Sequence, residues 1–193
     1  MQHQSRHGHP AFTLVEMLAV ISIIVILATV LVSSMSYVNE KRARSQVKVQ
    51  LGMLDMALEK YHSDFSTYPA TDDSPKGDRN SHILFNALYW DPNGDGQTVG
   101  TATGDAAPKP YLPELDPASN KQGWTSGKPS SQTKIVDPWN NEYRYRSGNN
   151  AAGKPNNSTR NSADFDLWSV GKDGQTNPAM PKDKVNRDDI WYP

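Results

Sequence analysis

The sequence contains no cysteine, and one long stretch near its N-terminus is almost free of glycine and proline. Without cysteine there is no disulfide framework, no thiol nucleophile and no cysteine-based zinc site. The 20 Lys+Arg residues nearly balance the 21 Asp+Glu residues, which argues against a basic nucleic-acid-binding protein. From Ala11 to Tyr68 there is one glycine, Gly52, and no proline, whereas 13 of the 14 prolines lie at Pro69 or later. This division excludes βαβ enzymes, which spread turn residues along the whole chain.

Catalytic signatures are also missing. There is no glycine-rich phosphate loop, no HExxH and no GxSxG motif. His62 and His82 have no serine or cysteine nucleophile in a recognisable motif beside them. We therefore expect a protein that is not an enzyme.

The sequence has one long hydrophobic run, residues 12–32 (FTLVEMLAVISIIVILATVLV), whose single charge is Glu16. About 20 apolar residues span a bilayer as a helix, so this run predicts a membrane span. A secretory signal peptide would have a shorter apolar core, and a plain signal anchor would need no charge. Neither explains Glu16, because a carboxylate at the centre of a membrane helix costs about 2.5–3.5 kcal/mol. A cation from a partner would offset that cost.

The residues around Glu16, read from residue 11 to 16 as AFTLVE behind a short polar leader, resemble the class III signal of type IV pilins and type II secretion pseudopilins. The resemblance implies that a prepilin peptidase cuts between Ala11 and Phe12 and then N-methylates Phe12. It also implies that the new ammonium group of Phe12 pairs with Glu16 of a neighbouring subunit in a filament. Ala11 stands where the family usually has glycine, and both residues are small.

Beyond the apolar run, the chain becomes amphipathic. Apolar side chains recur at helical spacing at Val47, Leu51, Leu54, Leu58 and Tyr61. We therefore predict one helix over 12–62 (12–32 transmembrane and 33–62 amphipathic) and a globular head over 63–193, and the resemblance implies a cleaved leader over 1–11. The resemblance implies an α+β fold in which a long N-terminal membrane-spanning helix packs on a small antiparallel β-sheet head.

The head begins with a loop-rich insertion over 70–134 that the resemblance does not cover. A short helix is predicted over 81–90, and the prolines make 101–134 a long loop. Residues 137–145 (DPWNNEYRY) resemble the DPWGN-x-Y segment of the major pseudopilin, protein G of the general secretion pathway. Asn140 replaces the usual glycine and, like glycine, tolerates positive φ. Residues 143–146 predict a half-buried strand, and 164–171 predict a second strand that pairs with it antiparallel.

The C-terminal segments 169–174 (SVGKDG) and 188–191 (DDIW) resemble the calcium loop of the same family. The resemblance implies a Ca²⁺ ion held by Asp173 and Asp188, with Asp189 as the alternate ligand and the carbonyl of Val170 as a backbone donor. The gap of 15 residues from Asp173 to Asp188 exceeds the usual one. Residues 175–187 therefore either bulge out or abolish the site, and ordinary turn carboxylates are the alternative.

A second, weaker metal candidate is the cluster Asp91, Asn93 and Asp95 in the segment 91–96 (DPNGDG). The segment 91–96 matches the first six positions of an EF-hand loop. Position 12 should be a bidentate glutamate but is Ala102, so a plain turn is the alternative.

Together, the resemblances imply a structural subunit of the type II secretion pseudopilus that supports protein export across the outer membrane. Its implied partners are copies of itself, minor pseudopilins, prepilin peptidase and the inner-membrane assembly platform. It would be a single-pass inner-membrane protein with a periplasmic head, and we expect no nucleic-acid partner. Alternatives are a minor pseudopilin, or a type IV pilin for adhesion, twitching or DNA uptake. A membrane-anchored calcium-binding module is an alternative of a different class.

Overall fold

The computed structural model describes residues 13–71, 79–99, 108–126, 128–150, 153–156, 159–160 and 164–192, and it leaves out the side chains of residues 30–34. By their internal contacts, the residues fall into two compact units, Met1–Arg42 and Ala43–Pro193.

One helix, α1 (Leu14–Phe65), contributes residues to both units. Its bounds lie close to the predicted 12–62. The helix ends where Ser66 takes a left-handed conformation (φ 56°) and donates its backbone N–H to the carbonyl of His62 at 2.7 Å. Pro69 follows three residues later and cannot continue a helix.

In the first unit, α1 exposes its apolar side chains. Among the large apolar side chains from Leu14 to Leu27, the exposed fraction ranges from 79% at Leu14 to 46% at Met17. The hydroxyl of Ser22 donates to the carbonyl of Leu18 at 2.8 Å, so this polar group is satisfied within the helix. Within the part of the chain that the structure describes, no helix has both the length and the hydrophobicity needed to cross a membrane. The predicted span also includes Phe12 and the side chains of 30–34, which lie outside the described residues.

In the second unit, the predicted apolar stripe of α1 is confirmed as the centre of the core. Val47, Leu54 and Leu58 are fully buried and Leu51 is 1% exposed, while Tyr61 at the end of the stripe is partly buried against the core. They belong to one hydrophobic cluster with side chains from the helical segment 84–88 and from the sheet. Tyr143 extends this packing with a hydrogen bond, since its hydroxyl donates to Oε1 of Gln50 at 2.6 Å.

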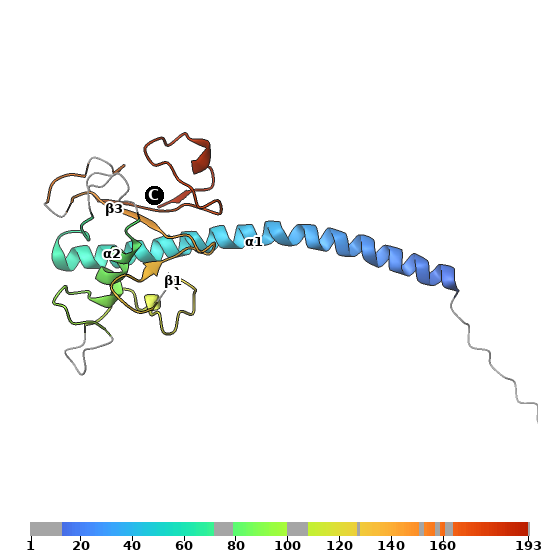
Figure 1. Ribbon diagram of the computed structural model, residues 1–193, viewed down its shortest axis with the longest axis horizontal. Coiled ribbons are helices and arrows are strands. Elements are labelled where there is room, and N and C mark those ends of the chain that lie inside the picture. The colour runs from blue at the N-terminus through green and yellow to red at the C-terminus, as the bar shows by residue number, and fades with distance from the viewer. Residues whose placement is uncertain are drawn as a thin grey trace, which may run out of the picture. The chain divides into compact units, whose positions relative to one another are not determined.

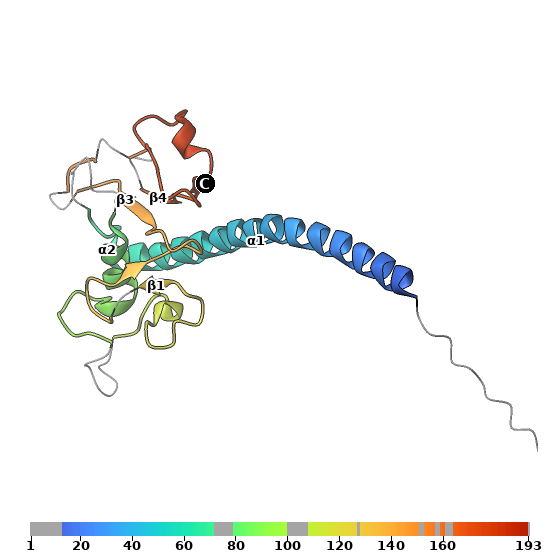
Figure 2. The same ribbon diagram turned by 45° about the vertical axis from the view of Figure 1, so that its right-hand side comes forward.

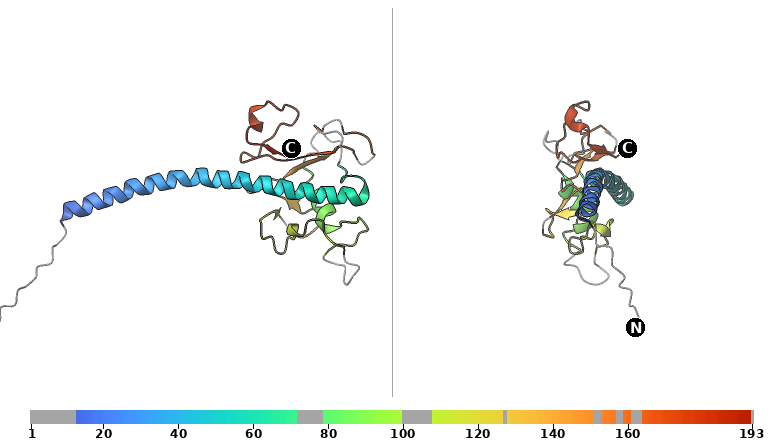
Figure 3. Two further views of the ribbon diagram at one scale, coloured as in Figure 1. Left: turned by 180° about the vertical axis from the view of Figure 1, so that it is seen from behind. Right: turned by 90° about the vertical axis from the view of Figure 1, so that its right-hand side faces the viewer.

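The second unit also contains two small antiparallel sheets. The larger has the order β3 (Arg144–Ser147), β4 (Phe165–Ser169) and β5 (Ile190–Trp191). The smaller pairs β1 (Thr125–Ser126) with β2 (Lys134–Ile135). In Figures 1, 2 and 3, the red C-terminal segment and the green-to-yellow segment lie on opposite sides of the C-terminal part of α1. The predicted antiparallel pairing of 143–146 with 164–171 is confirmed.

The prediction that the strand over 143–146 is half-buried is wrong, because side chains on both of its faces are buried. Every residue of β3 and β4 is buried. Trp168 stacks on Trp191 with their ring centroids 4.3 Å apart, and the guanidinium carbon of Arg146 lies 5.6 Å from the centroid of the Trp168 ring. The indole ring of Trp168, which stacks on Trp191, thus covers Arg146 on the face that the polar residues of β3 were expected to leave open.

The segment predicted to be loop-rich holds more structure than its prolines suggested. The predicted helix over 81–90 is confirmed as α2 (Ser81–Phe85) continued by a π-helical turn, η1 (Asn86–Trp90). The expected loop over 101–134 is corrected where it is described. It contains a 3₁₀ turn, η3 (Pro113–Leu115), and the strand β1, and both Leu115 and Trp124 are fully buried. Aromatic and leucine side chains therefore anchor this segment despite its turn residues.

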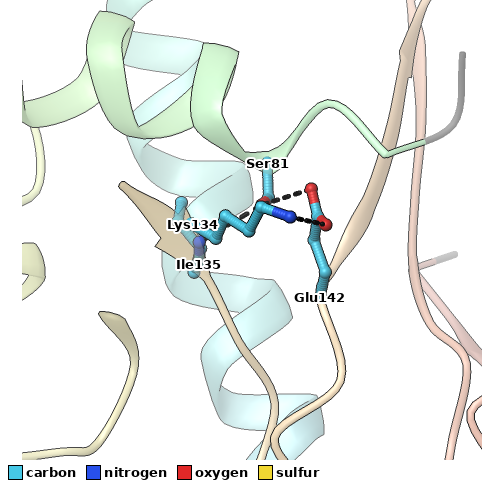
Figure 4. Close-up of polar contacts among 4 residues, drawn as sticks. All are labelled: Ser81, Lys134, Ile135 and Glu142. Carbon is cyan, nitrogen blue, oxygen red and sulfur yellow. Dashed lines mark hydrogen bonds and ion pairs between the residues drawn. The ribbon is translucent and has the colours of Figure 1, made fainter. Parts of the chain in front are cut away.

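The hydroxyl of Ser81 joins three segments at the start of α2 (Figure 4). It donates to Oε1 of Glu142 at 3.0 Å and accepts the backbone N–H of Ile135 at 3.2 Å. Glu142 also forms an ion pair with Lys134, with 3.2 Å between Nζ and Oε2. These contacts attach the insertion to the DPWNNEY segment, which leads into the larger sheet.

Candidate functional site

The first candidate site is the start of α1. The predicted processing residues Ala11 and Phe12 lie outside the described residues. Glu16 accepts two hydrogen bonds at Oε2, from the backbone N–H and from the hydroxyl of Thr13, both at 2.9 Å. The backbone N–H of Glu16 in turn donates to Oγ1 of Thr13 at 3.2 Å. This reciprocal pattern is a capping box, which the spacing Thr13-x-x-Glu16 signals in the sequence but which we had not predicted.

The capping box does not use up the acceptor capacity of Glu16. A carboxylate offers about four lone-pair positions on its two oxygens. The cap therefore fixes one end of the glutamate while the carboxylate stays on the exposed surface of the helix. Such a group can accept a cation from another chain without losing its role at the helix end.

The second candidate site begins with Asp137, which sequence reasoning had not singled out. Asp137 is 2% exposed, and its Oδ1 accepts the backbone N–H groups of Trp139 at 3.0 Å and Asn141 at 2.9 Å. Its Oδ2 accepts the hydroxyl of Ser169 at 2.6 Å. Burial raises the pKa of the Asp137 carboxyl, while these hydrogen bonds and the charge of Arg144 act in the opposite direction. Asp137 thus fixes the DPWNN turn and ties it to β4.

Asn141 continues this link to the acidic C-terminal turn. Its side-chain Nδ2 donates to the carbonyl of Gly171 at 2.7 Å, and a Cβ placed on Gly174 would lie 2.9 Å from its Oδ1. Asn140, in the position where the family usually has glycine, takes a φ of 66°, as its replacement of glycine predicted. The segments 137–145 and 169–174, which both carried the resemblance, are therefore in direct contact.

The predicted calcium ligands lie around this turn. Val170 is buried and directly precedes the turn 171–174, and Asp173 is exposed. Oδ2 of Asp188 accepts the backbone N–H of Asp173 at 3.0 Å, so these two residues are adjacent despite their separation in sequence. Gly171 packs so closely that a Cβ there would lie 2.5 Å from both the carbonyl oxygen and Oδ2 of Asp188.

Asp189 is held by a chain of hydrogen bonds. Nε1 of Trp168 donates to Oγ1 of Thr176 at 3.2 Å, and the Thr176 hydroxyl donates to Oδ2 of Asp189 at 2.7 Å. Burial raises the pKa of Asp189 to about 6, with further contributions from the negative charges of Asp188 and Asp173. Its Oδ1 is buried and has no hydrogen-bond partner. Thr176 is a positioning residue that no motif in the sequence had marked.

The long segment between Asp173 and Asp188 bulges out and is braced internally. The backbone N–H of Asn177 donates to Oδ1 of Asn186 at 2.6 Å, and Nδ2 of Asn186 donates back to the carbonyl of Asn177 at 3.0 Å. This clasp closes the bulge and returns the chain to Asp188 beside Asp173. The extra length is therefore compatible with the predicted meeting of the two aspartates.

The fit to a cation has two sides. The donor set consists of oxygens only, as a hard cation requires, and Oδ1 of Asp189 is a buried acceptor without a partner. Among the described residues, however, no three acidic or histidine side chains are grouped so that they could hold a metal ion. The chemistry of the ligands fits Ca²⁺, and its binding stays a proposal.

The second metal candidate forms a turn closed by its own hydrogen bonds. Nδ2 of Asn93 donates to Oδ2 of Asp95 at 2.7 Å, and Oδ2 of Asp91 accepts the backbone N–H of Gly96 at 3.1 Å. Gly94 and Gly96 take positive φ, as the Asn-Gly and Asp-Gly pairs predict for a turn. These hydrogen bonds fit a plain turn, whereas Oδ1 of Asp91 is buried and has no hydrogen-bond partner, as is also true of Oδ1 of Asp189.

Comparisons with known proteins match two separate stretches of the chain, and the second begins at residue 112, within the segment 70–134 that the resemblance was expected not to cover, and ends before Asp188. Residues 7–32, which include Thr13 and Glu16 of the first site, match the family model of the prokaryotic N-terminal methylation motif. Residues 112–187, which include Asp137, Asn141 and Asp173, match the model of protein G of the type II secretion system (T2SS). The two matches confirm the resemblance to this family and support a pseudopilin role. The searches of curated proteins and of solved structures returned no match.

Proposed function

We propose that the chain is a structural subunit of the type II secretion pseudopilus. The observation that carries this proposal is the start of α1, where apolar side chains are exposed and Glu16 is the one charge among them. An apolar surface of this extent needs lipid or other protein to cover it. The match of residues 7–32 to the methylation motif supports a membrane-anchored subunit that enters a filament.

In this proposal, prepilin peptidase cuts between Ala11 and Phe12 and methylates the new terminus. The ammonium group of Phe12 then pairs with Glu16 of a neighbouring copy, so two charges that are each unfavourable in an apolar setting compensate one another. The apolar helices bundle, and the heads lie outside the bundle in the periplasm. Minor pseudopilins and the inner-membrane platform are the further partners, and the filament supports export across the outer membrane.

Filament assembly in a host with a type II secretion system tests the proposal. Glu16→Gln keeps the size of the side chain and an acceptor for Thr13, but it removes the charge. We expect its cleavage to proceed and its filaments to be lost. Filaments of Glu16→Gln as abundant as those of the unchanged chain would overturn the pairing.

We propose further that Ca²⁺ binds at the C-terminal turn. Asp173 and Asp188 would supply carboxylates, with Asp189 as the alternate and the carbonyl of Val170 as a backbone donor. The support is the adjacency of Asp173 and Asp188 and the buried, unpartnered Oδ1 of Asp189. A cation would also offset the repulsion among these three carboxylates.

Thermal unfolding with Ca²⁺ or with a chelator tests the metal. A ligand that binds only the native state raises stability by RT ln(1 + [L]/Kd), about 2.7 kcal/mol at 100 times Kd. We expect Ca²⁺ to raise the unfolding midpoint of the unchanged chain and of Asp95→Asn, but not that of Asp188→Asn. An unchanged midpoint in the first chain would exclude the C-terminal site. A loss of the effect in Asp95→Asn would move the site to the 91–96 turn.

A further inference from the structure

One face of α1 in the second unit is directed away from the buried stripe. Val49 and Met56 on this face are 62% and 58% exposed, and Gly52 lies between them. Residues at positions i, i+3 and i+7 of a helix share one face. We call this surface, with the exposed Lys48 and Glu59 at its two ends, the outer face.

No contact that the structure describes within the chain requires a glycine at position 52. It lies inside a helix, where glycine is less stable than alanine, and it has no positive φ to require it. A Cβ built on Gly52 would meet nothing within 4 Å among the described atoms. The glycine instead leaves a flat place between two exposed apolar side chains, which allows another backbone to approach closely.

The two ends of the outer face carry opposite charges. Lys48 and Glu59 are 11 residues apart, which is about three turns of helix and about 16 Å along its axis. Oε1 of Glu59 accepts the hydroxyl of Tyr68 at 2.8 Å, so the carboxylate is held against the head while it remains exposed. A second copy that lies parallel and is shifted by this length brings its Lys48 beside Glu59 of the first copy.

We infer that the outer face binds a second copy of this chain in a parallel, staggered arrangement, with Gly52 as the point of close approach. The stagger of 11 residues places Ser45 of one copy beside Met56 of the next, and it places the exposed Lys41 beside Gly52, which has no side chain to obstruct it. Such a head-to-tail contact uses different residues on the two copies, so it propagates rather than closing as a dimer. The inference rests on the filament function proposed above and identifies a contact outside the predicted membrane segment.

Cysteine cross-linking in assembled filaments tests this register, and the natural chain has no cysteine to interfere. Ser45→Cys combined with Met56→Cys retains both charges of the outer face. On oxidation, the stagger predicts a ladder of dimers, trimers and longer species, since disulfides form between residues whose Cα atoms lie within about 7 Å. The matched control combines Gln46→Cys with Met56→Cys. Gln46 is exposed and next to Ser45 in sequence, but it lies on another side of the helix. This control should give a ladder at least fivefold weaker.

The outcomes separate this inference from the proposed function. Filaments without a stronger ladder than that of the Gln46 control would overturn the stagger and leave the filament function standing. A product that stops at dimers would contradict a propagating contact. Failure of the unchanged chain to form filaments would overturn the proposed function and this inference with it.

Gly52→Leu provides an independent test. Because its own chain leaves the position open, we expect an unfolding midpoint at or above that of the unchanged chain and at least a tenfold loss of filaments. Gly52→Ala, with one methyl group, should lose fewer filaments than Gly52→Leu. Normal assembly of Gly52→Leu would contradict a close approach at this position.

Discussion

The part of α1 in the first unit exposes its described leucine and valine side chains, whereas the part in the second unit buries most of them. Leu27 in the first unit is 58% exposed, whereas Leu54 in the second is fully buried. The buried stripe lies at helical spacing and is covered by the head, while the first part exposes apolar side chains on every side. Apolar content alone therefore does not show where a helix finds its partners.

The difference indicates where each part finds its stability. Tertiary packing of an amphipathic face stabilises most protein helices, and the second part of α1 obtains that packing from its own chain. The first part makes no such packing among the described residues, and its capping box fixes its start. We conclude that the head folds on one part of the helix, and the proposed function has lipid or neighbouring copies cover the other part.

The largest expected effect compares two leucines. Leu54→Ala leaves a cavity in the core and should lower the free energy of unfolding of the head by about 2–5 kcal/mol. Leu27→Ala should change it by less than about 0.5 kcal/mol, because an exposed site loses little packing. Urea unfolding of the full chain in detergent, followed by tryptophan fluorescence, measures both. Equal effects would refute the division of the helix.

Two carboxylates give the next comparison. Asp137→Ala removes a buried acceptor from two backbone N–H groups and from the hydroxyl of Ser169, so we expect a loss of about 2–3 kcal/mol. Glu16→Ala should leave the stability of the head unchanged and abolish assembly. Unfolding and filament assays on both variants check this contrast. A stable Asp137→Ala head would show that the DPWNN turn does not depend on its aspartate.

Two glycines give the smallest contrast and should change stability in opposite directions. Gly171 has a φ of 66° and closely contacts Asp188, so Gly171→Ala should lower the free energy of unfolding by about 1–3 kcal/mol. Gly52 is helical with open space around it, so Gly52→Ala should raise it by about 0.5–1 kcal/mol. Thermal unfolding distinguishes the two. A stabilising Gly171→Ala would contradict the tight turn at Asp188.

Sequence patterns predicted the elements that rest on local chemistry. The spacing of Val47, Leu51, Leu54 and Leu58 predicted the buried stripe, and Asn140 in place of glycine predicted a positive φ. The strands β3 and β4 and their pairing were also predicted correctly. These features depend on helical periodicity or on the conformational preference of single residues, which a sequence displays directly.

The features that were missed depend on contacts between distant residues. Nothing local to Arg146 indicates that Trp168, itself stacked on Trp191, covers its side chain, so the sequence predicted a half-buried strand. Thr176 acquires its role only because the Asn177–Asn186 clasp returns the chain to Asp189. The burial of Trp124 within a proline-rich segment likewise follows from the core it meets. Long-range packing of this kind leaves no periodic trace in a sequence.

The central claim is that the apolar start of α1 is an assembly segment, and that cleavage before Phe12 removes the leader in front of it. Co-expression of the full chain with a prepilin peptidase, followed by mass spectrometry of the mature N-terminus, tests it most directly. We predict an N-methylated phenylalanine at residue 12 and the loss of residues 1–11. An uncut chain, or a cut at any other bond, would contradict the account.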